Sequence, residues 1–348
     1  MDMNCAASVR GEVAVPSRPW PAKLAKYRER SNLRAIFEIV MTAGPFAGLW
    51  AGAWLATSVS YWLAMLISLL AAFFLVRLFM IQHDCGHGAL FGRRSANDWV
   101  GRVIGVLTLT PYDCWRRDHN QHHAGSGNLE RRGIGDVTTL TVNEYTSSTP
   151  WARFKYRLYR HPLVMFGIGP TFLFVIKHRV PGKSERHSLF AWVTTIATNV
   201  ATLCVICGLI AAVGLIPFLA VQIPLTMLGA TIGVWLFYVQ HQFEVTYWAH
   251  PPQWTSEAAA LHGSSYLILP EPLNWLTANI GLHHVHHLSS GIPFYRLPHV
   301  LKDWPELRNA RCLTVIESVR SLKLALWDEA SQRLVAFRHS EGHSSATG

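Results

Sequence analysis

The chain has 348 residues, of which 50% are hydrophobic and only 15% are charged, and it carries a formal charge of +10. This composition is closer to a multi-pass membrane protein than to a soluble enzyme. We expect no nucleic acid partner, because lysine and arginine are concentrated between apolar segments, as in cytoplasmic loops that face anionic lipid.

Four apolar runs are each long enough to cross roughly 30 Å of hydrocarbon as a helix. They lie at about residues 35–57, 61–82, 189–216 and 218–240. Within each pair the connection is very short, which predicts two transmembrane hairpins. Residues 1–34, polar and basic, precede the first run and are expected to be a cytoplasmic segment.

Two shorter apolar runs, 99–111 and 163–176, cannot cross the bilayer and are expected to be interfacial or re-entrant. Between them, Trp151, Phe154 and Leu158 share one helical face, and basic residues occupy the others. This pattern predicts a helix in the plane of the lipid headgroups, with a helix packed on a cytosolic core as the alternative.

Charge sets the expected orientation. Arg28, Arg30 and Arg34 precede the first span, whereas the tight turns within the two hairpins carry no lysine or arginine. Both termini are therefore predicted to be cytoplasmic. The fold expected is all-α: an integral membrane domain over 35–301, with a cytoplasmic helical cap, and a cytoplasmic C-terminal tail over 302–348.

Three clusters of histidines have the spacing of neighbours on a helix, i, i+3 and i+4. Each cluster would share one helical face, close enough for its side chains to converge on a metal. Every cluster falls at or beyond the predicted cytoplasmic end of a span, as does one further histidine after the fourth span. These nine residues are His83, His87, His119, His122, His123, His241, His283, His286 and His287.

Nine imidazoles exceed the three or four protein ligands of a single zinc site, so we expect two metal ions with four or five ligands each. Imidazole suits iron, zinc and copper, and the residues alone do not choose among them. A nearly neutral ligand set beside hydrocarbon favours redox or oxygen chemistry on an apolar substrate. Scattered histidines such as His178 and His299 are interpreted as ordinary polar residues.

Several polar neighbours are candidates to support the ligands. Asp84, Asp118 and Glu244 could orient imidazoles by accepting their distal N–H groups, or could be solvated surface acids. His284 is an extra histidine within the last cluster, suited to a supporting or a surface role.

The three clusters, HxxxH, HxxHH and a late HxxHH, resemble the histidine boxes of membrane-bound fatty acid desaturases, over about Tyr27 to Leu301. The stretches His122 to Tyr145 and His286 to Pro298 resemble bacterial acyl-lipid desaturases of the branch that also holds plant-type delta-12 and omega-3 enzymes. The resemblance implies a non-haem di-iron centre with the nine histidines as ligands, O2 as co-substrate and a bacterial inner membrane as location.

One position departs from the acyl-CoA branch of that family, where an asparagine one turn before the extra histidine reaches an iron through water. Phe237 stands there in this chain, and Gln240 and Asn279 are candidates to replace the asparagine. Arg131 and Arg132 are candidates for contact with a lipid headgroup, although such pairs also serve solubility.

The expected activity is therefore O2-dependent insertion of a cis double bond into the acyl chain of a lipid. The reaction needs two external electrons, and the sequence has neither a haem-type HPGG motif nor clustered iron–sulfur cysteines. A separate donor, a ferredoxin or similar carrier with its reductase, is expected. The alternatives are a di-iron hydroxylase or alkane monooxygenase and, more distantly, a metal-binding membrane transporter.

Overall fold

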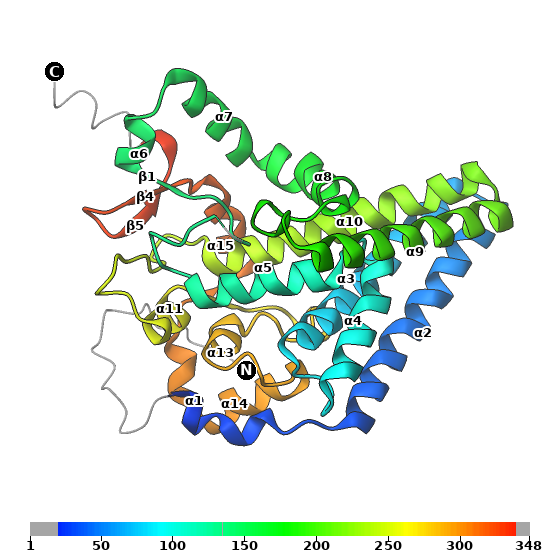
Figure 1. The fold of residues 1–348 in the computed structure, drawn as a ribbon, viewed down its shortest axis with the longest axis horizontal. Coiled ribbons are helices and arrows are strands. Elements are labelled where there is room, and N and C mark those ends of the chain that lie inside the picture. Colours follow the sequence, from blue (N-terminus) through cyan, green and yellow to red (C-terminus); the bar gives the residue numbers. More distant parts are fainter. Residues whose placement is uncertain (1–19, 134, 339–348) are drawn as a thin grey trace.

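The computed structural model describes residues 20–133 and 135–338, so the outer parts of both predicted terminal segments lie outside the described residues. Helices make up most of the described chain (Figure 1). Four of them are long and apolar enough to cross a membrane: α2 (Asn32–Ala56), α3 (Tyr61–His87), α9 (Leu189–Val213) and α10 (Leu215–His241). Gly214 alone separates α9 from α10, with a positive φ of 86° that glycine tolerates.

Two of these helices continue past the ends that hydropathy predicts. α3 runs on from residue 82 to His87, and α10 reaches His241, so that the first histidine box and the extra histidine lie on final helical turns. Gly88 ends α3 in the left-handed conformation, with a φ of 66°. Hydropathy misses these turns because they are polar, although Gln82 and Asp84 are buried in the folded chain.

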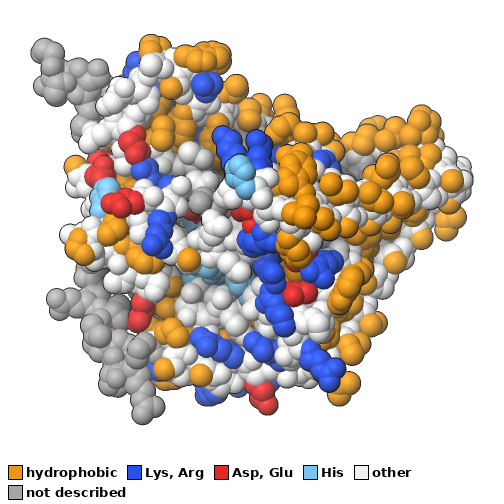
Figure 2. All heavy atoms as spheres, viewed as in Figure 1, with side chains coloured by type: hydrophobic (Ala, Val, Ile, Leu, Met, Phe, Trp, Pro, Cys, Tyr) orange, Lys and Arg blue, Asp and Glu red, His pale blue; other side chains and the backbone are white. Residues whose placement is uncertain are grey.

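α3 lies at the centre of the apolar bundle. Of its most apolar stretch 56% is buried, against 11% for α9, whose side chains face outward. Gly229 of α10 allows close packing there, because a Cβ atom at this position would lie 3.2 Å from Leu75 of α3. Apolar side chains cover the far part of α2, α9 and α10 (Figure 2). This surface is what a bilayer requires of the helices that cross it.

A buried ion pair joins α2 to α3. Arg77 Nη2 lies 2.5 Å from Glu38 Oε2, and the two side chains are only 1% and 2% exposed. Arg77 also donates to Thr42 Oγ1 at 3.1 Å and lies over the ring of Trp275, 4.0 Å from its centroid. Charges this deeply buried are tolerated because each has a partner.

Shorter helices surround the ends of the long ones. A π-helical turn at Val164–Ile168 precedes α8, and the segment from α7 onward bends by 57°, which makes it a broken span or a re-entrant loop. The short helices before α9 are α1 (Trp20–Lys23), α4 (Arg94–Leu107), α5 (Tyr112–Gly125), α6 (Val142–Thr146), α7 (Pro150–Arg160) and α8 (Gly169–Val175). Those after α10 are α11 (Ser256–His262), α12 (Glu271–Leu276), α13 (His283–Leu288), α14 (Leu297–Asp303) and α15 (Val315–Arg320).

Short strands, which an all-α expectation omits, connect distant segments. β1 (Leu140–Thr141) pairs in parallel with β4 (Leu326–Asp328), which pairs antiparallel with β5 (Arg333–Val335). β2 (Tyr266–Leu267) pairs in parallel with β3 (Cys312–Leu313). The described chain beyond residue 301 thus contacts earlier segments through β3 and β4.

Candidate metal centre

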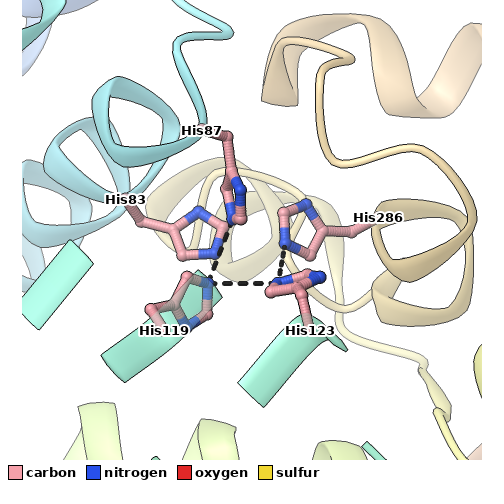
Figure 3. A group of neighbouring side chains, drawn as sticks. All are labelled: His83, His87, His119, His123 and His286. Carbon is pink, nitrogen blue, oxygen red and sulfur yellow. Dashed lines mark hydrogen bonds between the residues drawn. The ribbon is translucent and has the colours of Figure 1, made fainter. Parts of the chain in front are cut away.

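The nine predicted histidines lie together in two groups beside the ends of α3 and α10. Group A contains five histidines and group B four, and within each group one ring nitrogen per residue lies within 4.8 Å of all the others. Figure 3 shows the side chains of group A pointing toward one another from α3, α5 and α13. Group A is His83, His87, His119, His123 and His286, and group B is His122, His241, His283 and His287.

Helix geometry explains why each HxxHH box serves both groups. Positions i and i+4 are close in angle around a helix, whereas i+3 lies about 100° from i+4. On α5, His119 and His123 accordingly enter group A and His122 enters group B. On α13 the pattern reverses: the outer pair enters group B, and His286 enters group A. The sequence predicts one shared face per cluster, which holds for His83 and His87, both in group A, and is wrong for the two HxxHH boxes.

The spacing of the ring nitrogens suits metal coordination. In group A, Nε2 of His119 lies 3.0 Å from Nε2 of His87 and 3.1 Å from that of His123. In group B, Nε2 of His241 lies 2.9 Å from Nε2 of His283 and 3.1 Å from that of His122. Two nitrogens that bind one ion at about 2.1 Å, roughly 90° apart, would lie about 3 Å from each other. The two groups therefore fit a metal ion each.

The protonation state of the rings also suits a metal. Burial, followed by the effect of neighbouring imidazoles, lowers the pKa well below the ordinary 6.5 for His119, His123, His283, His286 and His287. Rings that stay neutral at pH 7 keep the lone pair that a metal ion needs. The two groups are also adjacent, since the rings of His123 and His287 stack with centroids 4.1 Å apart.

Two acceptors fix the orientation of rings in group B. Nδ1 of His122 donates to the carboxylate of Asp136, and both side chains are at most 9% exposed. Nδ1 of His241 donates to the carbonyl oxygen of Gly263 at 3.0 Å. Each bond leaves Nε2 as the free ligand atom. The Asp136 loop approaches α5 closely at Gly135, whose φ is +65° and where a Cβ atom would lie 3.2 Å from that of His122.

Asp136 has no assigned role in the sequence interpretation, although it stands inside the stretch His122 to Tyr145 that resembles acyl-lipid desaturases. Its position directly after Gly135, in a loop with a second glycine at Gly133, was the available signal. Trp115 was missed as well: its ring stacks on His119 of group A, with centroids 4.7 Å apart and planes 13° from parallel. An aromatic residue one turn before the second box was the signal there.

The three carboxylates predicted to support the ligands differ in what they contact. Asp84 lies beside group A, where its carboxylate accepts from His83 Nδ1 at 3.4 Å and from the backbone N–H of Phe294 at 2.7 Å. Within the described residues, neither Asp118 nor Glu244 has a hydrogen bond to a grouped histidine. Glu244 is exposed and pairs with Arg333 at 3.4 Å, because the chain leaves the bundle directly after α10 ends.

Gln240 and Asn279 lie close to the boxes but face backbone carbonyl groups. Nε2 of Gln240 donates to the Ile280 carbonyl at 3.4 Å, and Nδ2 of Asn279 donates to that of Phe294 at 3.2 Å. His284 is fully buried, outside both groups, and burial lowers its pKa to about 4. A surface role for His284 is therefore wrong.

Phe237 lies against group B, with its ring centroid 5.1 Å from that of His122. Of the two arginines considered for a headgroup, Arg132 is paired with Glu144, at 2.6 Å between Nη2 and Oε1. Arg131 is exposed, and its Nη1 donates to the carbonyl of Ala124 at 3.4 Å.

Comparison with known proteins agrees with this geometry. Residues 60–313 match the fatty acid desaturase family. The chain is 41% identical to a fatty acid desaturase of Bacillus subtilis over 91% of its own length and 89% of that protein. It is 28% identical to a Synechocystis sn-1 acyl-lipid omega-3 desaturase (ferredoxin) over 77% of its own length and 74% of that protein. It is 27% identical to an endoplasmic reticulum omega-3 fatty acid desaturase of Vigna radiata over 83% of its own length and 78% of that protein. A match over most of the chain, together with a metal-binding arrangement of histidines at the ends of membrane helices, shows that this chain belongs to the fatty acid desaturase family of oxidoreductases.

Proposed function

We propose that the protein is an acyl-lipid desaturase that inserts a cis double bond into a membrane acyl chain at a pair of iron ions. The observation that supports this proposal best is the division of nine histidines into groups of five and four at the ends of two apolar helices. Groups of this size suit two ions rather than one, and their position suits a substrate that lies in the bilayer.

The reaction needs an oxidant, because an unactivated methylene has no acidic proton and no leaving group. The iron pair, when bound, would supply the oxidising power that removes two hydrogens from neighbouring carbons. Per double bond, one O2, two substrate hydrogens, two electrons and two protons give two waters. An all-imidazole donor set is compatible with iron.

The remaining tasks belong to the chain itself. The nine imidazoles would hold the ions, and Asp136 and the Gly263 carbonyl would fix the tautomer and angle of two ligands of group B. Six of the nine rings are buried, which keeps bulk water from most of the centre. The phenyl ring of Phe237 adds an apolar surface beside group B.

The topology proposed follows from the same arrangement. α2 with α3 and α9 with α10 would cross a bacterial inner membrane as two hairpins, with both termini and the histidine groups on the cytoplasmic side. The shared position of the groups at the ends of α3 and α10 supports this layout. Residues 35–301 would then form the membrane domain, 1–34 the cytoplasmic N-terminal segment and 302–348 a cytoplasmic C-terminal portion.

A separate carrier would deliver the electrons. The Synechocystis relative is named as a ferredoxin-dependent enzyme, and a ferredoxin with its reductase is the donor that we propose here too. No nucleic acid has a part in this scheme.

Expression in a host that makes no unsaturated fatty acids tests the function. Mass spectrometry of derivatised lipids should show a new cis double bond at one fixed position, formed only in air. A hydroxylated chain as the main product would instead indicate a hydroxylase or monooxygenase. Altered cellular metal content with unchanged lipids would indicate a transporter.

A further inference from the structure

The metal centre is open to the surface at its last histidines. Six of the nine grouped rings are buried, and the three that are partly exposed are the final histidine of each box: His87, His123 and His287. These open histidines are adjacent, with ring centroids 4.6 Å apart for His87 and His123 and 4.1 Å apart for His123 and His287. Histidine side chains are visible in a hollow on the face shown in Figure 2, with lysine and arginine side chains beside it.

An exposed arginine packs behind the first open histidine. Both terminal nitrogens of Arg94 lie 3.4 Å from the carbonyl oxygen of Gly86, the residue before His87. Gly88 makes room for this guanidinium, because a Cβ atom there would lie 2.9 Å from Arg94 Nη1. The side chain is 47% exposed, and Asp98 at 3.1 Å neutralises only part of the local positive charge.

The other two boxes repeat the arrangement. Nη1 of the exposed Arg131 donates to the carbonyl of Ala124, directly after the second box, at 3.4 Å. Nε of the exposed Arg28 donates to the hydroxyl of Ser289, two residues after the third box, at 2.9 Å, and its chain packs on Gly291. Three arginines from three separate segments thus contact residues one or two positions from the three open histidines. We call Arg28, Arg94 and Arg131 the arginine rim.

We propose that the arginine rim is the docking surface for an acidic iron–sulfur electron carrier, which delivers electrons one at a time to the metal centre through the edges of the open histidines. This inference rests on the proposed function, which requires two external electrons per double bond. The carrier must bring its cluster close to the centre, and within the described residues the open histidines are the part of the nine-residue set that it can reach.

The distribution of charge favours a protein over a small phosphate. A phosphate group is held by donors that converge on it. Each arginine of the rim is instead anchored to a different backbone segment, around an opening formed by three boxes. An extended acidic surface can engage all three at once, and exposed charges of this kind accelerate encounter and set orientation more than they add tight contacts.

Charge removal tests the docking surface. In lipid nanodiscs, the triple variant R28Q/R94Q/R131Q is compared with R320Q/K323Q/R333Q. The second variant removes the same number of exposed cations at positions that, within the described residues, make no hydrogen bond to a histidine box. The probe is a plant-type [2Fe–2S] ferredoxin, and the readout is its dissociation constant at low and high salt. We expect binding to the rim variant to weaken on the order of tenfold at low salt, with little difference at high salt, and the control variant to stay within about twofold of wild type.

Turnover with a small reductant separates this inference from the proposed function. With reduced methyl viologen in place of ferredoxin, the double variant R28Q/R94Q, which keeps the headgroup candidate Arg131, should desaturate as fast as wild type. Equal ferredoxin affinities for the two triple variants, or no ferredoxin binding by a wild type that desaturates with viologen, would overturn the docking surface alone. A wild type that forms no double bond with either reductant would overturn the function. Should the triple variant not fold, Arg131→Gln alone removes only one long hydrogen bond and should weaken binding severalfold; an unchanged affinity would contradict the proposal.

Discussion

Replacement of Asp136 by alanine should weaken metal binding in group B and leave group A intact. The carboxylate accepts from His122 Nδ1 in a place where neither side chain is more than 9% exposed, so water cannot easily replace it. Loss of such a partner generally costs about 10- to 100-fold in metal affinity, or roughly 1.4–2.7 kcal/mol. The other oriented ring of group B, His241, should be unaffected, because its acceptor is the backbone carbonyl of Gly263.

Titration of purified protein with a chelator, followed by elemental analysis of the retained iron, measures this effect. Wild type should lose its two irons at similar chelator concentrations, and Asp136→Ala should lose the first at a concentration about 10- to 100-fold lower. Asp136→Asn keeps an oxygen acceptor but not its charge, so its loss should be intermediate.

Asp118→Ala is the matched control. Asp118 precedes His119 of group A on α5 but, within the described chain, makes no hydrogen bond to a grouped histidine. Its removal should leave both irons in place. The reasoning would be refuted if Asp136→Ala released iron at the wild-type chelator concentration, or if the two alanine variants behaved alike.

Other predictions follow from the same geometry. Purified protein should hold close to two irons per chain by elemental analysis, and one zinc with little iron in active protein would contradict the di-iron proposal. His122→Ala and His286→Ala should abolish desaturation while His299→Ala keeps it, as lipid profiles at matched protein levels would show; equal losses would contradict the ligand set. Gly105→Ala should lower the free energy of unfolding by about 1–3 kcal/mol, because the added Cβ atom would lie 2.4 Å from the Thr110 carbonyl oxygen. Gly48→Ala should be neutral or stabilising by up to about 1 kcal/mol, because an added Cβ atom there would have no other atom within 4 Å. A lower melting temperature for Gly48→Ala than for Gly105→Ala would contradict the close approach of Gly105 to Thr110.

The sequence predicts helices well where apolar residues form a long continuous run or recur with a regular spacing. Apolar runs predict the existence of α2, α3, α9 and α10, because long hydrophobic stretches have few other uses. The same signal failed at their ends, since the turns that carry His83, His87 and His241 are polar and become buried only through contacts with later segments. Strands of two or three residues escaped detection because partners far along the chain stabilise them.

The candidate site shows the same limit. Spacing brought out the histidines, because i, i+3 and i+4 positions are neighbours within one helix. The contact between His122 and Asp136 depends instead on the path of a loop, which passes α5 closely only because Gly135 adopts a positive φ. Glu244 failed as a candidate for the opposite reason: it stands three residues after His241, but α10 has ended by then, and its carboxylate faces Arg333.

The division of the boxes between two groups determines which parts of the fold a metal would join. Group A draws on α3, α5 and α13, whereas group B draws on α5, α10 and α13. α3 and α10 belong to different pairs of apolar helices, and each contributes to one group only. The shared helices α5 and α13 would therefore connect the two pairs through the ligands, and an ion lost from group B would remove the metal link to α10 while the link to α3 remains. Because ligands from separate segments gain order when they bind one ion, metal loading should stabilise the packing of the two helix pairs against each other as well as supply the chemistry.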